Sequence, residues 1–178
     1  MCRAPESFFT ARLAAARPVP ADEEFLIETW SDARVVNWLG GPRDRPAVLA
    51  LSAHWDDLWD SQGLGAWILR NRNDEVPVGW VLLHPMDFGS HTGIEVGWAI
   101  VADRWREGLA TEAAQRVVEI AFTDCALGEV ISGTMTTNVA SRGVMEKLGF
   151  VYDCDVEHAG LQHALYRLDR TTWEKTHG

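Results

Sequence analysis

The chain has 178 residues, the length of one domain, and its 47% hydrophobic and 24% charged residues exclude dominant disorder. No stretch approaches the ~20 apolar residues of a membrane-spanning helix, so no membrane partner is expected. The 16 basic against 26 acidic residues give a formal net charge of −10. Nucleic acid is not an expected partner either, because phosphate binding needs clustered positive charge, whereas a cationic amine suits an acidic surface. We therefore predict one domain over residues 1–178.

The cysteines and the N-terminus bear on compartment. Cys2, Cys125 and Cys154 are too few and too widely spaced to predict a disulfide framework, although a Cys125–Cys154 pair stays open as an alternative. Buried thiols in a reducing compartment are the simpler interpretation. Arg12 and Arg17 interrupt the only apolar run near the N-terminus, which therefore does not resemble a signal peptide. We expect a cytoplasmic protein.

The N-terminal third predicts one strand followed by helices. Weak alternation over residues 7–16 indicates the strand. Residues 21–30 and 33–39 are typical of two short helices that end at the Gly-Gly-Pro of residues 40–42. Residues 48–59 predict a third helix.

The rest of the chain predicts a hairpin-rich sheet that closes through a crossover. Residues 65–70 and 78–83 form a hairpin, and a second hairpin-like connection at 87–92 leads into 94–101. That last run is nearly continuous in apolar residues, as in a buried central strand. The elements expected after it are helix 111–125, strand 130–136, helix 139–148 and strands 150–156 and 161–168. The predicted class is α/β, a mixed and mostly antiparallel sheet of about seven strands, flanked by helices, with one central parallel crossover.

Residues 95–114, EVGWAIVADRWREGLATEAA, carry the strongest chemical signal. A buried strand ends, a turn follows, and a helix opens after Gly108. The unpartnered amides and the dipole of a helix start form an anion site suited to a pyrophosphate. Thr111 can add a hydroxyl, and Arg104 and Arg106 add positive charge. Gly108 by itself would be an ordinary turn glycine; the whole assembly makes the site, which matches neither the Rossmann nor the Walker pattern.

Two segments resemble motifs of the GNAT N-acetyltransferases. WREGLATEA at residues 105–113 is similar to the acetyl-CoA motif Gln/Arg-x-x-Gly-x-Gly/Ala, and NVASRGVMEKLGF at 138–150 is similar to the family's downstream segment. Trp105 at the first motif position resembles the ribosomal-protein N-terminal (Rim-type) subgroup, as does the opening of the chain. The resemblance implies the GNAT fold, with a core at about residues 8–168.

The resemblance also implies acetyl-CoA as co-substrate, no metal, and a homodimer at the level of the family. The backbone of Ala99, Ile100 and Val101 would bind the pantetheine arm like an added strand. Asn138 would bond the pantetheine or the tail end of the cofactor channel. The turn that would hold the pyrophosphate consists of Arg106, Glu107, Gly108, Leu109, Ala110 and Thr111.

Acetyl transfer to an amine needs a proton acceptor and a proton donor. Glu95 is the candidate general base, since a lone carboxylate in an apolar strand is costly without a purpose. By alternation it shares a face with the small residues Gly97 and Ala99. The alternative interpretation is that Glu95 is a hydrogen-bonded carboxylate of the strand with no catalytic role. Many family members place a Tyr where this chain has Met145, which cannot donate a proton.

Without that tyrosine, Ser141 or water is left as the acid, and Ser141 bonded to its own helix is the competing interpretation. The subgroup resemblance favours a protein N-terminal α-amino group as acceptor. A small amine and a non-catalytic acyl-CoA-binding module are the alternatives. Trp30 and Trp38 are candidate acceptor-wall residues, with core packing as the other interpretation. The histidines and cysteines lack H-E-x-x-H and C-x-x-C spacing, so no metal site is expected.

Overall fold

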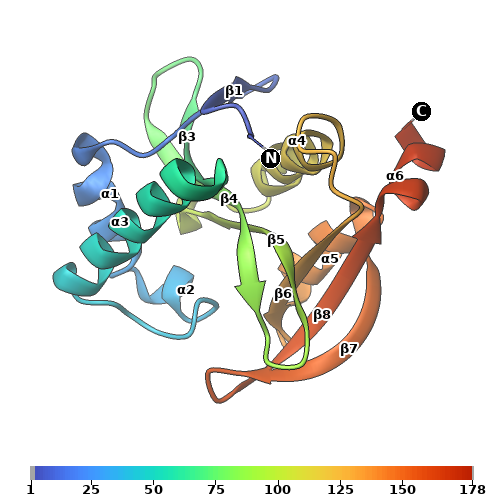
Figure 1. The fold of residues 1–178 in the computed structure, drawn as a ribbon. Helices are drawn as coiled ribbons and strands as arrows, with labels where there is room; N and C mark the ends of the chain where they lie inside the picture. The colour runs from blue at the N-terminus through green and yellow to red at the C-terminus, as the bar shows by residue number, and fades with distance from the viewer. Residues whose placement is uncertain (1–2, 178) are drawn as a thin grey trace.

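The fold is built on one eight-stranded sheet in the order β1-β2-β3-β4-β5-β6-β8-β7. Figure 1 shows the ribbon of this computed structural model. The structure describes residues 3–177. Neighbouring strands pair antiparallel except β5 and β6, which are parallel. The strands are β1 (Ser7–Phe9), β2 (Leu13–Ala16), β3 (Gly65–Asn71), β4 (Pro77–Asp87), β5 (Thr92–Ile100), β6 (Glu129–Met135), β7 (Val151–His158) and β8 (Leu161–Asp169).

Helices cover both faces of this sheet. The α-helices are α1 (Glu23–Thr29), α2 (Ala33–Val36), α3 (Arg45–Gln62), α4 (Leu109–Thr123), α5 (Val139–Lys147) and α6 (Arg170–His177). Single 3-10 turns precede α1 and α4, as η1 (Pro20–Asp22) and η2 (Ala102–Arg104). The predicted mixed sheet with one parallel crossover is confirmed.

The strand count differs from the prediction because residues 7–16 form two strands. Thr10 ends β1: its amide donates to the Leu13 carbonyl at 2.9 Å, and the Leu13 amide donates to its hydroxyl at 3.0 Å. These bonds reverse the chain, so β1 and β2 pair as a short hairpin. The sheet therefore has eight strands instead of about seven.

Some helices begin or end at other residues than the sequence predicts, because capping residues set their boundaries. The helix expected at 48–59 begins at Arg45, because the Asp44 carboxylate accepts a hydrogen bond from the Ala47 amide at 3.0 Å. It ends before Gly63, whose φ of 69° is left-handed. The sequence did not indicate α6, where Trp173 packs on Phe122 with ring centroids 5.3 Å apart.

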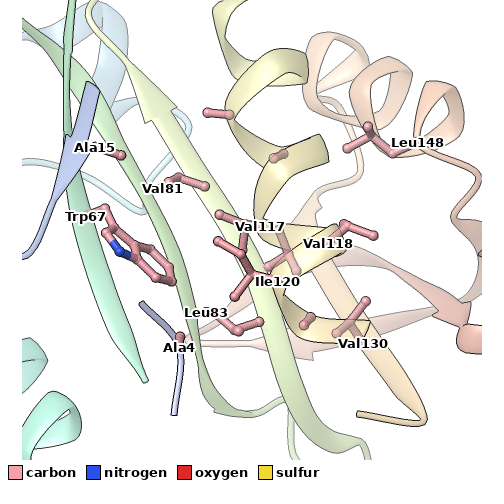
Figure 2. Close-up of a cluster of buried hydrophobic side chains, with 14 of the residues drawn as sticks. Ala4, Ala15, Trp67, Val81, Leu83, Val117, Val118, Ile120, Val130 and Leu148 are labelled. Atoms are coloured by element: carbon pink, nitrogen blue, oxygen red, sulfur yellow. The ribbon is translucent and has the colours of Figure 1, made fainter. Parts of the chain in front are cut away.

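Two apolar layers hold the helices to the sheet. Apolar residues of α4 recur every three or four positions, so Val117 and Ile120 lie beside Val81 and Leu83 of the sheet, while Val118 points to the other side of the helix (Figure 2). A second cluster packs α1, α2 and α3 on the opposite face. The C-terminal ends of β5 and β6 lie between these two layers, and a site can form there.

Two findings bear on the expectations about compartment. None of the helices in residues 3–177 is long and apolar enough to cross a membrane. Cys154 carries a free thiol, so the Cys125–Cys154 disulfide that the sequence left open is not formed. Cys125 is disulfide-bonded, so the expectation of a buried free thiol is wrong for this residue. Cys2 lies outside the described residues.

Candidate active site

The parallel strands β5 and β6 part at Glu95. Over the described residues they share one register pair, Glu95 with Ile131. The hydroxyl of Ser132 then donates to the Val96 carbonyl at 2.8 Å, which is a side-chain link in place of a ladder bond. Beyond this point β6 stays paired with β8. The two strands thus leave a gap whose inner end is at Glu95.

Glu95 is buried where the strands part, and each of its carboxylate oxygens has one polar contact. Its residue surface is 8% exposed. One carboxylate oxygen accepts the amide N–H of Gly133 at 3.2 Å, and the other lies 3.1 Å from Nε2 of His84. His84 stands directly opposite on β4, and its buried Nδ1 atom has no hydrogen-bond partner within the described part of the chain. Glu95, which is buried, and His84, which is half-buried, therefore form a pair in which one ring nitrogen has no partner among residues 3–177.

Aromatic rings line the space next to the pair. A Cβ added at Gly133 would come within 2.3 Å of the Phe88 ring, so Phe88 lies directly against the strand that bonds Glu95. Phe88 in turn meets His158 at 5.2 Å and His163 at 6.1 Å between ring centroids. Phe88 and the two histidine rings therefore pack beside the strand whose Gly133 amide bonds Glu95.

The edge of β5 that faces the gap can be read from its pairing with β4. The Val101 amide donates to the Val78 carbonyl at 2.9 Å. In an antiparallel ladder the backbone groups of alternate residues face the same way, so those of Ala99 and Val101 point to β4. Those of Ile100 and Trp98 point to the gap. The Ile100 carbonyl accepts the indole N–H of Trp105 at 2.7 Å, which leaves Trp98 with both backbone groups available.

The turn before α4 has the geometry of an anion site. Gly108 caps the helix with a φ of 80°, and Arg106 also has a positive φ of 65°. Gly108 provides no side-chain cap, so the first amides of α4, from Leu109 through Ala110 to Thr111, have no helical acceptor. Across residues 3–177, neither the Arg106 guanidinium nor the Thr111 hydroxyl has a hydrogen-bonding or ionic partner. These donors converge on one turn.

Arg12, which lies between β1 and β2, contacts the turn before α4. Its guanidinium donates to the Glu107 carbonyl at 2.8 Å and to the Glu112 carboxylate at 2.6 Å, and it lies 3.5 Å from a Cβ built at Gly108. Burial raises the pKa of Glu112, but hydrogen bonds from Thr10 and Arg12 outweigh it and hold that pKa below its usual value. Arg12, bonded to this carboxylate, is held beside the proposed phosphate position.

The side chain of Glu107 pairs with an arginine and does not contribute to the anion site. Its side chain pairs with Arg104 at 2.8 Å, and this hydrogen bond lowers the pKa of Glu107. Arg104 is therefore paired with a carboxylate, as Arg12 is with Glu112, and within residues 3–177 Arg106 is the cation of this turn that has no ionic partner.

Among the residues that were considered on α5, some have structural contacts and one hydroxyl has no partner in the described chain. Asn138 is the N-cap of α5: its side chain accepts the Ser141 amide at 3.1 Å. Across the described chain the Ser141 hydroxyl has no hydrogen-bond partner. Met145 is 1% exposed and packs in the core beside α4. Tyr166 is buried too, and its hydroxyl is occupied by Arg142 at 3.0 Å and Glu146 at 3.1 Å.

Two tryptophans were candidates for an acceptor wall. Trp30 is buried and stacks on Trp80 with centroids 5.8 Å apart, which places it in the core under α1–α3. Trp38 is half-buried just after α2. Core packing is therefore the role of Trp30.

Sequence reasoning missed two residues of this site. His84 could have been found, because the hairpin connection at 87–92 fixes the register that sets it opposite Glu95. Arg12 had no comparable signal, since it lies 100 residues before Glu112 and reaches it only through the fold.

Comparisons with known proteins show which family and which fold the chain resembles. A family described as acetyltransferase (GNAT) domain matches residues 12–151. FsC-acetyl coenzyme A-N(2)-transacetylase of Aspergillus fumigatus is 28% identical over 159 residues, which cover 84% of this chain and 67% of the relative. The uncharacterized N-acetyltransferase YoaA of Bacillus subtilis is 24% identical over 143 residues, which cover 79% of this chain and 80% of the relative.

Solved structures share the fold. An acetyltransferase of Agrobacterium tumefaciens has a TM-score of 0.83 at 22% identity, over 96% of this chain and 98% of that one. Ribosomal-protein-S5-alanine acetyltransferase of Vibrio fischeri has a TM-score of 0.74 at 15% identity, over 94% and 98%. An aminoglycoside acetyltransferase in complex with coenzyme A has a TM-score of 0.77 at 16% identity, over 93% and 99%. Since both acceptor types occur among these neighbours, the Rim-type subgroup is not singled out.

Proposed function

Because the chain belongs to the GNAT acetyltransferase family, we propose that it transfers the acetyl group of acetyl-CoA to a protein N-terminal α-amino group. The coarser activity, N-acetylation of an amine, is that of the family. The observation that carries the proposal is the buried Glu95 at the inner end of the gap between β5 and β6, with His84 behind it. A neutral amine nitrogen brought to that point meets a proton acceptor.

The residues present fit acetyl-CoA. The unpartnered amides at the start of α4, together with Arg106 and Arg12, suit the diphosphate. The free backbone groups of Trp98 suit the amides of the pantetheine arm, as an added strand would. When bound, acetyl-CoA supplies an acetyl group activated as a thioester.

The chain's own residues then handle two protons. Glu95 accepts, through water, the proton that the amine nitrogen loses as its bond to the acetyl carbon forms. His84 positions that carboxylate through the 3.1 Å contact. As the carbon–sulfur bond breaks, the departing thiolate takes a proton, for which we propose the hydroxyl of Ser141, which regains a proton from a solvent water in the same step. Met145 has no proton to donate, and the hydroxyl of Tyr166 is already bonded to two side chains.

A small-molecule amine is the second candidate acceptor. It is favoured by the Aspergillus relative, whose name describes acetyl transfer to an N(2) position of FsC. The net charge of −10 suits a cationic acceptor of either kind.

The test is thiol release from acetyl-CoA with a panel of acceptors. The panel contains a peptide with a free N-terminus, the same peptide with a blocked N-terminus, spermidine and an aminoglycoside. The proposal expects turnover with the free peptide and none with the blocked one. Turnover with the small amines alone would assign the second acceptor class. Binding of acetyl-CoA without turnover for any amine would support a non-catalytic module instead.

A further inference from the structure

A second group of metal-binding side chains lies away from the gap, where the β4–β5 connection meets β7. His91, Asp153 and Cys154 each offer one ligand atom, and these three atoms lie within 4.8 Å of one another. His91 and Cys154 are half-buried, and Asp153 is exposed. His91 and Cys154 are 63 residues apart in the sequence, so no spacing motif could have shown this group.

The spacing of the two softer ligands suits a tetrahedral metal ion. Nε2 of His91 lies 3.6 Å from Sγ of Cys154. A tetrahedral zinc ion with a bond of about 2.3 Å to sulfur and about 2.0–2.1 Å to nitrogen would hold these two atoms about 3.6 Å apart. The metal-free contact is a thiol–imidazole hydrogen bond, and a metal ion would replace its proton, which leaves to solvent.

A β-bulge brings the third ligand to the same side. Adjacent residues of a regular strand point to opposite faces, so Asp153 and Cys154 would normally diverge. In β7 the register shifts between Tyr152 and Cys154, so the backbone of Asp153 is an extra residue with no register partner in β8. Such a bulge re-aims side chains, and here it brings the carboxylate to the thiol.

Two neighbours provide an outer shell. Nδ1 of His91 bonds the Ser90 hydroxyl at 2.9 Å, which leaves Nε2 to face Cys154. One oxygen of Asp153 accepts a hydrogen bond from Arg167 at 2.6 Å, and the carboxylate also has a side-chain hydrogen bond with Cys154, whose proton a metal ion would replace.

From this arrangement we propose that His91, Asp153 and Cys154 form a zinc-class metal site with one open position. Imidazole, thiolate and carboxylate together suit a borderline-soft divalent ion, and neither calcium nor magnesium favours such a set. The ion would tie the β4–β5 connection, which leads directly into the strand of Glu95, to the edge strand β7. This goes beyond the acetyltransferase activity and does not depend on it.

The test is titration of the full, reduced protein with Co²⁺, followed by competition with Zn²⁺. The expected result is a thiolate-to-cobalt band and intense tetrahedral d–d bands that saturate at one equivalent and disappear with Zn²⁺. Cys154→Ser removes the thiolate band. His91→Gln and Asp153→Asn weaken binding by about 100-fold or more, because loss of an outer-shell partner alone costs 10–100-fold.

Matched controls separate this site from adventitious binding. His54→Gln changes an exposed histidine on α3, and Glu157→Gln changes an exposed carboxylate on the same strand as Asp153. We expect both variants to retain wild-type affinity. Circular dichroism of each variant without metal verifies its fold. A thiolate band that persists in Cys154→Ser, no saturable band in the wild type, or equal losses in the controls would overturn the proposal.

Discussion

Replacing Glu95 by Gln tests the proposed chemistry with little change in shape. The amide oxygen of Gln can still accept the Gly133 amide, now at 3.2 Å, and its NH₂ group can still meet His84. The buried pair is therefore kept while the base is lost, so the fold should survive. Loss of a general base costs about 10²–10⁴-fold in rate. We expect kcat/KM for the amine to fall by that factor while the affinity for acetyl-CoA stays unchanged.

The pH dependence of this variant adds a second readout. With a pKa near ~8, an α-amino group is about 10% neutral at pH 7 and about 90% neutral at pH 9. Without its base, the Glu95→Gln enzyme depends on amine that is already neutral, so its rate should rise about tenfold across this range. His84→Gln should lower kcat by less than Glu95→Gln, because it disturbs only the orientation of the carboxylate.

The assay is thiol release under saturating acetyl-CoA with the acceptor that the panel identifies. Glu119→Gln, at an exposed position on α4, is the matched control and should match the wild type. If Glu95→Gln retains wild-type kcat/KM at pH 7, Glu95 is only a hydrogen-bonded strand carboxylate and the proposed mechanism is refuted.

Three further outcomes follow from the geometry. Gly108→Asp introduces a side chain at a φ of 80° and a negative charge at the turn, so coenzyme A affinity by calorimetry should fall about tenfold or more, whereas Gly128→Asp, at an open position, should not change it. Glu112→Gln should lower the free energy of unfolding in urea by about 1–2 kcal/mol at pH 7. Because the folded-state pKa of Glu112 is lowered, this difference is present above the unfolded pKa and should vanish as the pH falls through the folded one; a constant difference would contradict the assignment. Ser141→Ala should lower kcat by about tenfold or more with unchanged acetyl-CoA affinity, and an unchanged kcat would assign the proton to water.

The sheet could be predicted because hydrophobic periodicity and turn residues are local signals. The apolar run at 94–101 and the connection at 87–92 set the central strands correctly. Side-chain capping is less visible: Thr10 divided the expected first strand, and Asp44 moved the start of α3. The C-terminal helix α6 depends on Trp173 packing against Phe122, a tertiary contact that periodicity does not record.

The residues of the candidate site that are adjacent in the sequence could be predicted, and those that only the fold brings together could not. Gly108 and its neighbours stand within one continuous segment, so the sequence could present them together. The pairing of Glu95 with His84 needs the hairpin register, and the approach of Arg12 to the turn needs the whole sheet. The backbone groups of Trp98, in place of those of Ala99 and Val101, face the gap because the ladder with β4 fixes their phase.

A crystal structure of the chain with coenzyme A tests the central claim most directly. The account predicts the pantetheine arm between β5 and β6, bonded to the backbone of Trp98, with the diphosphate on the amides that follow Gly108. The sulfur should then lie at the inner end of the gap, beside Glu95. Coenzyme A bound elsewhere on the sheet, or with its sulfur remote from Glu95, would contradict it.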